Sequence, residues 1–176
     1  MSDLPYRPNV GAVLFNHEGR VLVARRAPQP GRGETGSGAW QLPQGGMDEG
    51  ESPRAAVLRE LAEEIGTDRA EILAEHEEWL HYDLPEHLVG VVWGGKWRGQ
   101  RQRWFALRFT GQDSDIRLDA DAHQEFDAWR WAALEELPDL AVAFKRPIYE
   151  TLVRSFARFA VPVAGQPGDG ASPPSS

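Results

Sequence analysis

Residues 45–66, GGMDEGESPRAAVLRELAEEIG, constrain the fold and chemistry of this chain more than any other segment. Ser52 is a residue type that caps helices and Pro53 suits the first helical position, so we expect a helix to begin there. Gly66 can adopt the left-handed conformation that commonly ends a helix. The segment therefore predicts a glycine-rich approach followed by one capped helix.

At about 100° per residue, the side chains of this helix fall on two opposite faces. The apolar face, expected to pack on the core, contains Leu58, Leu61, Ala62 and Ile65. The acidic face directs the carboxylates of Glu60, Glu63 and Glu64 toward one point. Such a cluster repels itself, and a hard divalent cation with oxygen ligands relieves the repulsion. The alternative is an ordinary solvated face, which is common for acidic helices.

The spacing of the neighbouring residues favours the metal-binding interpretation. Gly45, Glu51, the pair Arg59-Glu60, the pair Glu63-Glu64 and Gly66 follow the pattern G-x5-E-x7-R-E-L-x-E-E-x-G. This pattern resembles the signature of the Nudix hydrolase family. The chain departs from it at Thr67, where the family usually has an aliphatic residue.

The resemblance implies an α/β fold, an α/β/α sandwich with a mixed β-sheet between helices. It also implies hydrolysis of a phosphoanhydride with Mg²⁺, Mn²⁺ or another divalent cation as cofactor. By the same resemblance Glu60, Glu63 and Glu64 would bind the metal. Arg59, Glu51 and Gly45 would support these ligands.

Further segments resemble one branch of that family, which includes bacterial RNA pyrophosphohydrolases and the asymmetric diadenosine tetraphosphate hydrolases of bacteria and plants. They are YRPNVG (6–11), WQLPQGG (40–46), YDLP (82–85), GQRQRWF (99–105), EFDAWRW (125–131) and FKRPIY (144–149). In that branch the glutamate matching Glu125 is a further metal ligand or the catalytic base. Glu64 is the other candidate for the base, and the resemblance leaves the choice open.

Three functions follow from the resemblance, in order of preference. The first is pyrophosphate removal from the 5′ end of triphosphorylated or diphosphorylated RNA, a step in RNA turnover. The second is hydrolysis of diadenosine tetra- or pentaphosphate with release of ATP. The third, from another class, is a noncatalytic nucleotide sensor, which would usually lack acidic signature residues that this chain retains.

Several residues outside the helix are candidates for substrate binding. Arginine binds phosphate oxygens bidentately, so Arg7 and Arg26 are candidates for phosphate contacts, with solvated strand ends as the alternative. Phe144 would stack on a base beside a Lys145–phosphate contact, or else belong to the core. Tyr82 is either a base-stacking residue or a half-buried strand aromatic. Residues 96–104 mix basic, amide and aromatic side chains, typical of a substrate rim or of an amphipathic strand.

Composition narrows the class of protein further. The 176 residues carry a net charge of −8, so we expect no extended duplex DNA partner. The chain contains no Cys, and its five His residues lack zinc-site spacing. No signal peptide or membrane span is visible, which predicts a cytoplasmic protein without a membrane partner; its oligomeric state is not specified.

The rest of the chain predicts a single domain over residues 1–160. We expect a hairpin from strands at 6–15 and 20–25, then a Gly/Pro-rich loop at 27–38. Further strands are expected at 77–82, 103–109 and 126–131. A final helix over 144–159 would bury Ile148, Leu152, Phe156 and Phe159. Residues 161–176, rich in Pro, Gly and Ser, are expected to form a disordered tail.

Overall fold

The computed structural model describes residues 4–27, 39–120 and 124–163 of the chain. In these residues the strands are β1 (Tyr6–Phe15), β2 (Val21–Arg26), β3 (Trp40–Gln41), β4 (Gln44–Gly46), β5 (Ala70–Glu75), β6 (Leu80–Asp83), β7 (Gly99–Phe109) and β8 (Phe126–Ala132). The α-helices are α1 (Pro53–Ile65), α2 (Leu137–Leu140) and α3 (Arg146–Phe156). Short 3₁₀ turns, including Val92–Gly95 and Ala143–Lys145, connect some of them.

All these strands join one mixed sheet. Its main path runs β3-β2-β1-β7-β5, while β4 pairs with β1, β6 with β7 and β8 with β2. The central pair, β1 and β7, is parallel from Tyr6↔Gly99 to Phe15↔Arg108, whereas the other pairs are antiparallel. This pairing places β4, which follows β3 in the chain, against the first half of β1.

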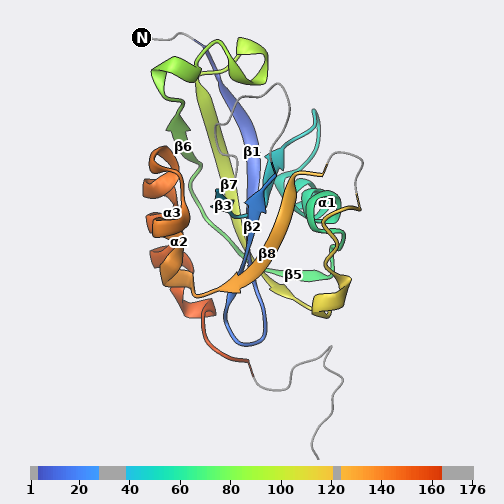
Figure 1. Ribbon diagram of the computed structural model, residues 1–176. Helices are drawn as coiled ribbons and strands as arrows, with labels where there is room; N and C mark the ends of the chain where they lie inside the picture. The colour runs from blue at the N-terminus through green and yellow to red at the C-terminus, as the bar shows by residue number, and fades with distance from the viewer. Residues whose placement is uncertain (1–3, 28–38, 121–123, 164–176) are drawn as a thin grey trace, which may run out of the picture.

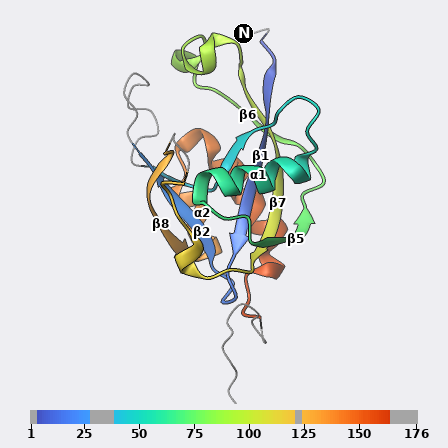
Figure 2. The same ribbon diagram turned by 90° about the vertical axis from the view of Figure 1, so that its right-hand side faces the viewer.

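Helices cover both faces of the sheet. Helix α1 lies on one face, and α2 and α3 lie on the other (Figure 1). Turned by 90°, the view shows α1 crossing in front of the central strands (Figure 2). The strands are apolar on both faces because each face is covered, and each face has its own buried cluster. The expected α/β/α sandwich with a mixed sheet is confirmed.

Local predictions for α1 are confirmed at both ends. The Ser52 hydroxyl oxygen accepts a hydrogen bond from the Ala55 N–H at 3.2 Å, and Pro53 occupies the first turn. Gly66 ends the helix with a φ of 77°. The predicted apolar face did not include Ala56 and Val57, which are fully buried in the structure. Leu58 and Ala62 are only partly buried.

Other boundaries differ from expectation. The first strand is confirmed over 6–15 and pairs with β2 as a hairpin. Strand β7 starts at Gly99 rather than at 103, and β5 was not predicted. The strand expected at 77–82 begins at Leu80, and α3 covers only Arg146–Phe156. Phe159 lies in a 3₁₀ turn (Ala157–Phe159) after the helix and still packs on the core.

Two predictions fall largely outside the described part of the chain, namely most of the loop at 27–38 and most of the tail at 161–176. Residues 161–163 are described and are exposed. Among the helices of the described residues, none is long and apolar enough to cross a membrane.

Candidate active site

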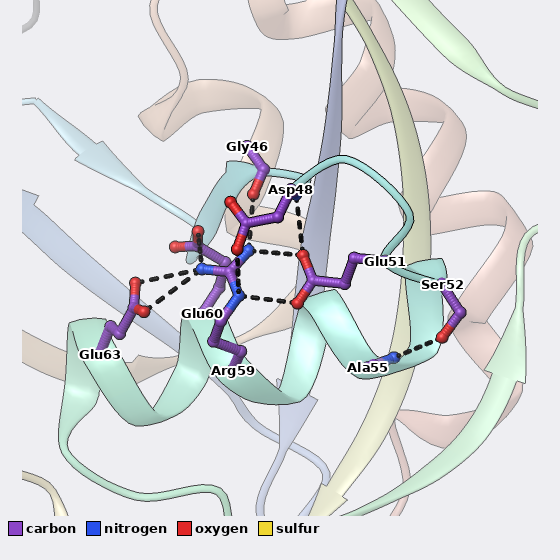
Figure 3. Close-up of polar contacts among 8 residues, drawn as sticks. All are labelled: Gly46, Asp48, Glu51, Ser52, Ala55, Arg59, Glu60 and Glu63. Atoms are coloured by element: carbon purple, nitrogen blue, oxygen red, sulfur yellow. Dashed lines mark hydrogen bonds and ion pairs between the residues drawn. The ribbon is translucent and has the colours of Figure 1, made fainter.

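Arg59, in the middle of α1, bonds to acidic residues of the helix and of the segment before it (Figure 3). Its guanidinium donates to both carboxylate oxygens of Glu51, at 2.8 and 2.9 Å. It also donates to Glu60 at 3.0 Å, to Glu63 at 3.3 Å and to the Gly46 carbonyl at 2.8 Å. A planar guanidinium can satisfy such a set because its five N–H donors point in fixed directions. Arg59 therefore links α1 to the glycine-rich segment before it.

Glu51 is the firmest partner of Arg59. Besides the two bonds from Arg59, its carboxylate accepts the Asp48 N–H at 2.9 Å. These bonds to the charged form, those from Arg59 first, lower the pKa of Glu51 to about 2. The same pairing raises the pKa of Arg59. The supporting role expected for both residues agrees with this geometry.

Gly45 allows Glu60 to lie directly against β4. A Cβ atom at position 45 would overlap the Glu60 carboxylate, so only glycine leaves room for it. Burial raises the pKa of Glu60 to about 6, with Arg59 opposing the shift and the charges of Glu63 and Glu125 adding to it. The first glycine of the pattern thus sets the position of a candidate metal ligand.

Glu64 is buried, with 8% of its surface exposed, because β4 covers that side of α1. Its Oε1 accepts the Gln44 N–H at 3.1 Å. Burial raises its pKa well above the ordinary value, and the charges of Glu60 and Glu125 add to this. The sequence placed Glu60, Glu63 and Glu64 on one face of the helix, and the structure adds that Glu64 on this face is buried. Of the three, only Glu63 is exposed, and it turns toward Arg59.

Within the described residues, no three His, Asp or Glu side chains are grouped closely enough to hold an ion as they stand. The chemistry of the donor set nevertheless fits a divalent cation. Glu60 and Glu64 lie one turn apart on α1, and Glu125 comes from the segment before β8; the charges of Glu60 and Glu125 are close enough to raise the pKa of Glu64 by repulsion. Carboxylate oxygens are the ligands that Mg²⁺ prefers, and a cation among them would offset that repulsion.

The substrate-binding candidates meet next to these carboxylates. The Tyr82 and Phe144 rings lie 5.3 Å apart, and the Lys145 ammonium is 5.7 Å from the Tyr82 ring centre. Burial, with the nearby charge of Arg26, lowers the pKa of Lys145 to about 8. The Arg7 guanidinium lies beside Gly46 of β4, and its charge acts on Tyr82. The structure thus brings together all five candidates, which sequence alone could only name separately.

Tyr82 differs from the other candidates because its ring is buried. Its hydroxyl donates to Gln100 at 2.9 Å, and burial raises its pKa. The interpretation as a packed strand aromatic is therefore favoured over base stacking, which needs an open ring face. Phe144 and Lys145 lie in the turn before α3 and are only partly buried.

Two features of the site were not anticipated from the sequence. Gln44 contacts both Glu64 and Lys145, the acidic and the basic parts of the site. In the sequence it is a single polar residue before two glycines, and nothing there indicates these contacts. Trp93, whose ring stacks under the Arg7 guanidinium at 5.6 Å, has a φ of 51°, unusual for a bulky residue. In the sequence, the adjacent Gly94 and Gly95 are the local indication of a backbone turn with positive φ at this place.

Comparison with known proteins agrees with this architecture. The NUDIX domain family matches residues 5–152. The RNA pyrophosphohydrolase of Gluconacetobacter diazotrophicus is 62% identical over 162 residues, covering 92% of this chain and 97% of that protein. The RNA pyrophosphohydrolase of Rhodospirillum rubrum is 57% identical over 161 residues, covering 92% and 93%.

Solved structures are similar at the level of the fold. The E. coli dihydroneopterin triphosphate pyrophosphohydrolase aligns with a TM-score of 0.62 at 21% identity, covering 86% of this chain and 99% of that one. A C. elegans Ap4A hydrolase binary complex aligns with a TM-score of 0.59 at 20% identity, covering 86% and 98%.

Proposed function

This chain belongs to the Nudix family and is a Nudix hydrolase, and on that premise we propose that it removes pyrophosphate from the 5′-triphosphate end of RNA. The observation that carries this substrate is the identity of 62% to a protein named RNA pyrophosphohydrolase, over 97% of that protein's length. An RNA substrate would place the activity in the cytoplasm. Diadenosine polyphosphates are the competing substrate class, because they also join a polyphosphate to a purine.

The proposed metal ligands are Glu60, Glu63, Glu64 and Glu125, with Mg²⁺ as the expected ion. When bound, the ion supplies charge for the phosphoryl oxygens and lowers the pKa of a coordinated water. Arg59 would act indirectly, because it holds Glu60 and Glu63 in place. The attacking water must lose a proton, and either Glu64 or Glu125 would accept it at a carboxylate oxygen.

The phosphate-binding part of the site would consist of Arg7, Arg26 and Lys145. The charges of Arg7 and Arg26 act on Tyr82, and the Lys145 ammonium lies 5.7 Å from the Tyr82 ring centre. They would offset the charge of the polyphosphate while the carboxylates bind the metal. Phe144, partly buried beside Lys145, is the proposed contact for the first base.

The test is to compare kcat/KM on a triphosphorylated RNA oligonucleotide and on diadenosine tetraphosphate, with Mg²⁺ and then Mn²⁺. We expect the RNA to be preferred. Glu64→Gln should reduce turnover by about a hundredfold or more, because it removes a metal ligand or base. Glu78→Gln, at an exposed carboxylate outside the site, is the matched control and should retain activity. A strong preference for the dinucleotide would overturn the proposed substrate.

A further inference from the structure

Gln44 bonds to both halves of the site. Its backbone N–H donates to Glu64 Oε1 at 3.1 Å. Its side-chain Oε1 accepts from the Lys145 ammonium at 3.5 Å, and its Nε2 donates to Gln100 Oε1 at 3.2 Å. One residue of β4 therefore stands between a candidate metal ligand or base and a candidate phosphate-binding cation.

Buried neighbours fix the orientation of the Gln44 amide. Gln100 is 2% exposed, and its Oε1 also accepts from the Tyr82 hydroxyl at 2.9 Å and from Gln102 Nε2 at 3.3 Å. Gln102 is held in turn by Asn9 at 2.8 Å. Since Gln100 presents an acceptor, Gln44 must turn its NH₂ group toward it. The Gln44 oxygen then faces Lys145.

Within the described residues, Gln44 is the hydrogen-bond acceptor that the Lys145 ammonium contacts. Within the described part of the chain, none of the ion pairs involves it, and its hydrogen bond to Gln44 is a long one. An ammonium has three N–H donors, so at least two remain for an anionic ligand. Arg26, which also acts on Lys145 electrostatically, adds to the attraction for an anion.

We propose that Gln44 is a positioning residue that holds the Lys145 ammonium at a fixed place relative to Glu64, so that Lys145 meets the polyphosphate while Glu64 serves the reacting phosphorus. The inference deepens the proposed function and rests on its phosphate-binding role for Lys145. It adds a role for an amide whose partners are Lys145 and Gln100.

The experiment is a double-mutant cycle with Gln44→Met, Lys145→Met and the double variant. The probe is adenosine 5′-(α,β-methylene)triphosphate, which resists hydrolysis at the bond that pyrophosphate removal would break, and its Kd is measured with Mg²⁺ present. Gln44→Met should raise Kd about tenfold, equivalent to about 1.4 kcal/mol. In the Lys145→Met background it should change Kd less than about twofold, because its partner is gone.

Kinetics separate positioning from a merely structural role. Gln44→Met keeps the backbone N–H that bonds Glu64, so KM should rise more than kcat falls. Gln41→Met, a buried glutamine in β3 with no hydrogen bond to Lys145, is the matched control for the cost of removing an amide. Should Gln44→Met fold poorly, Gln44→Asn, which is too short to reach both partners, provides the same test.

The inference would be overturned if Gln44→Met changed the Kd equally in the wild-type and Lys145→Met backgrounds. It would also be overturned if Gln44→Met changed the Kd no more than Gln41→Met does. The outcome is independent of the choice between RNA and dinucleotide, because both substrates carry a polyphosphate. A protein that binds the probe as expected but prefers diadenosine tetraphosphate would refute only the proposed substrate.

Discussion

Replacing Glu51 with glutamine tests whether the Glu51–Arg59 pair holds the glycine-rich segment against α1. The change keeps the shape of the side chain but removes the charge that receives two bonds from Arg59. It also weakens the bond to the Asp48 N–H. The side chains of Glu51 and Arg59 are 15% and 27% exposed, so the pair is partly shielded from water.

The magnitude follows from the shift in pKa. Folding lowers the Glu51 pKa from 4.5 to about 2. At about 1.4 kcal/mol per unit the upper limit is about 3 kcal/mol, and solvent screening at the rim reduces this to about 1–2 kcal/mol. Because the folded pKa is the lower one, this stabilisation is complete above about pH 5. It is lost as the pH falls toward about 2.

The assay is denaturant unfolding of wild type and Glu51→Gln at about pH 7 and at steps down to about pH 3. We expect the difference in the free energy of unfolding to shrink steadily with acid. Glu49→Gln, two residues away at an exposed carboxylate with no ion pair among the described residues, is the control and should change little. A difference that stays constant with pH, or a control of equal effect, would refute the reasoning.

Three more predictions concern Gly45, Lys145 and Gly66. Gly45→Ala should lower kcat/KM at least tenfold while leaving the melting temperature nearly unchanged, because the flexible Glu60 carboxylate is what must move; intact activity would contradict this. Lys145→Met should weaken polyphosphate binding yet stabilise the fold by about 1–2 kcal/mol at pH 7, since burial disfavours the charged lysine. That gain should be complete below about pH 8 and disappear toward about pH 10.5, as measured by urea unfolding at several pH values. Gly66→Ala should destabilise by about 1–3 kcal/mol in thermal unfolding, because φ is 77° and the Arg117 carbonyl oxygen lies 2.6 Å from the new Cβ; a neutral result would show that the turn adjusts.

Features encoded locally could be predicted from the sequence. The caps of α1 depend on Ser52, Pro53 and Gly66 themselves, so the helix was located correctly at both ends. The first strand, a continuous apolar run, was also located correctly. Arg59 was expected to support the carboxylates, and its bonds to Glu60 and Glu63 follow from separations of one and four residues along the helix.

Features that depend on distant segments could not be predicted. Residues 70–75, AEILAE, have helix-forming composition and become β5 only because they pair with β7. Gln100 and Gln102 are polar residues of a type usually found on the surface. They are buried here because their side chains bond to each other, and that of Gln102 also to Asn9. Glu64 is buried by β4, which precedes it by some twenty residues. Helical periodicity alone therefore places Glu64 on the solvent-facing side of α1, although the side chain is buried.

The parallel pairing of β1 with β7 has a consequence for how the protein folds. Tyr6 and Gly99 are neighbours in the sheet, although residues 7–98, more than half of the 176-residue chain, lie between them. Closing a loop of that length costs about 4 kcal/mol of chain entropy before any contact is gained. Strand β4, helix α1 and strand β6 all lie within that loop. Gln44 and the carboxylates of α1 lie inside that loop, and Glu125 follows β7 in the chain, so we expect the site to be completed late, when the two central strands meet.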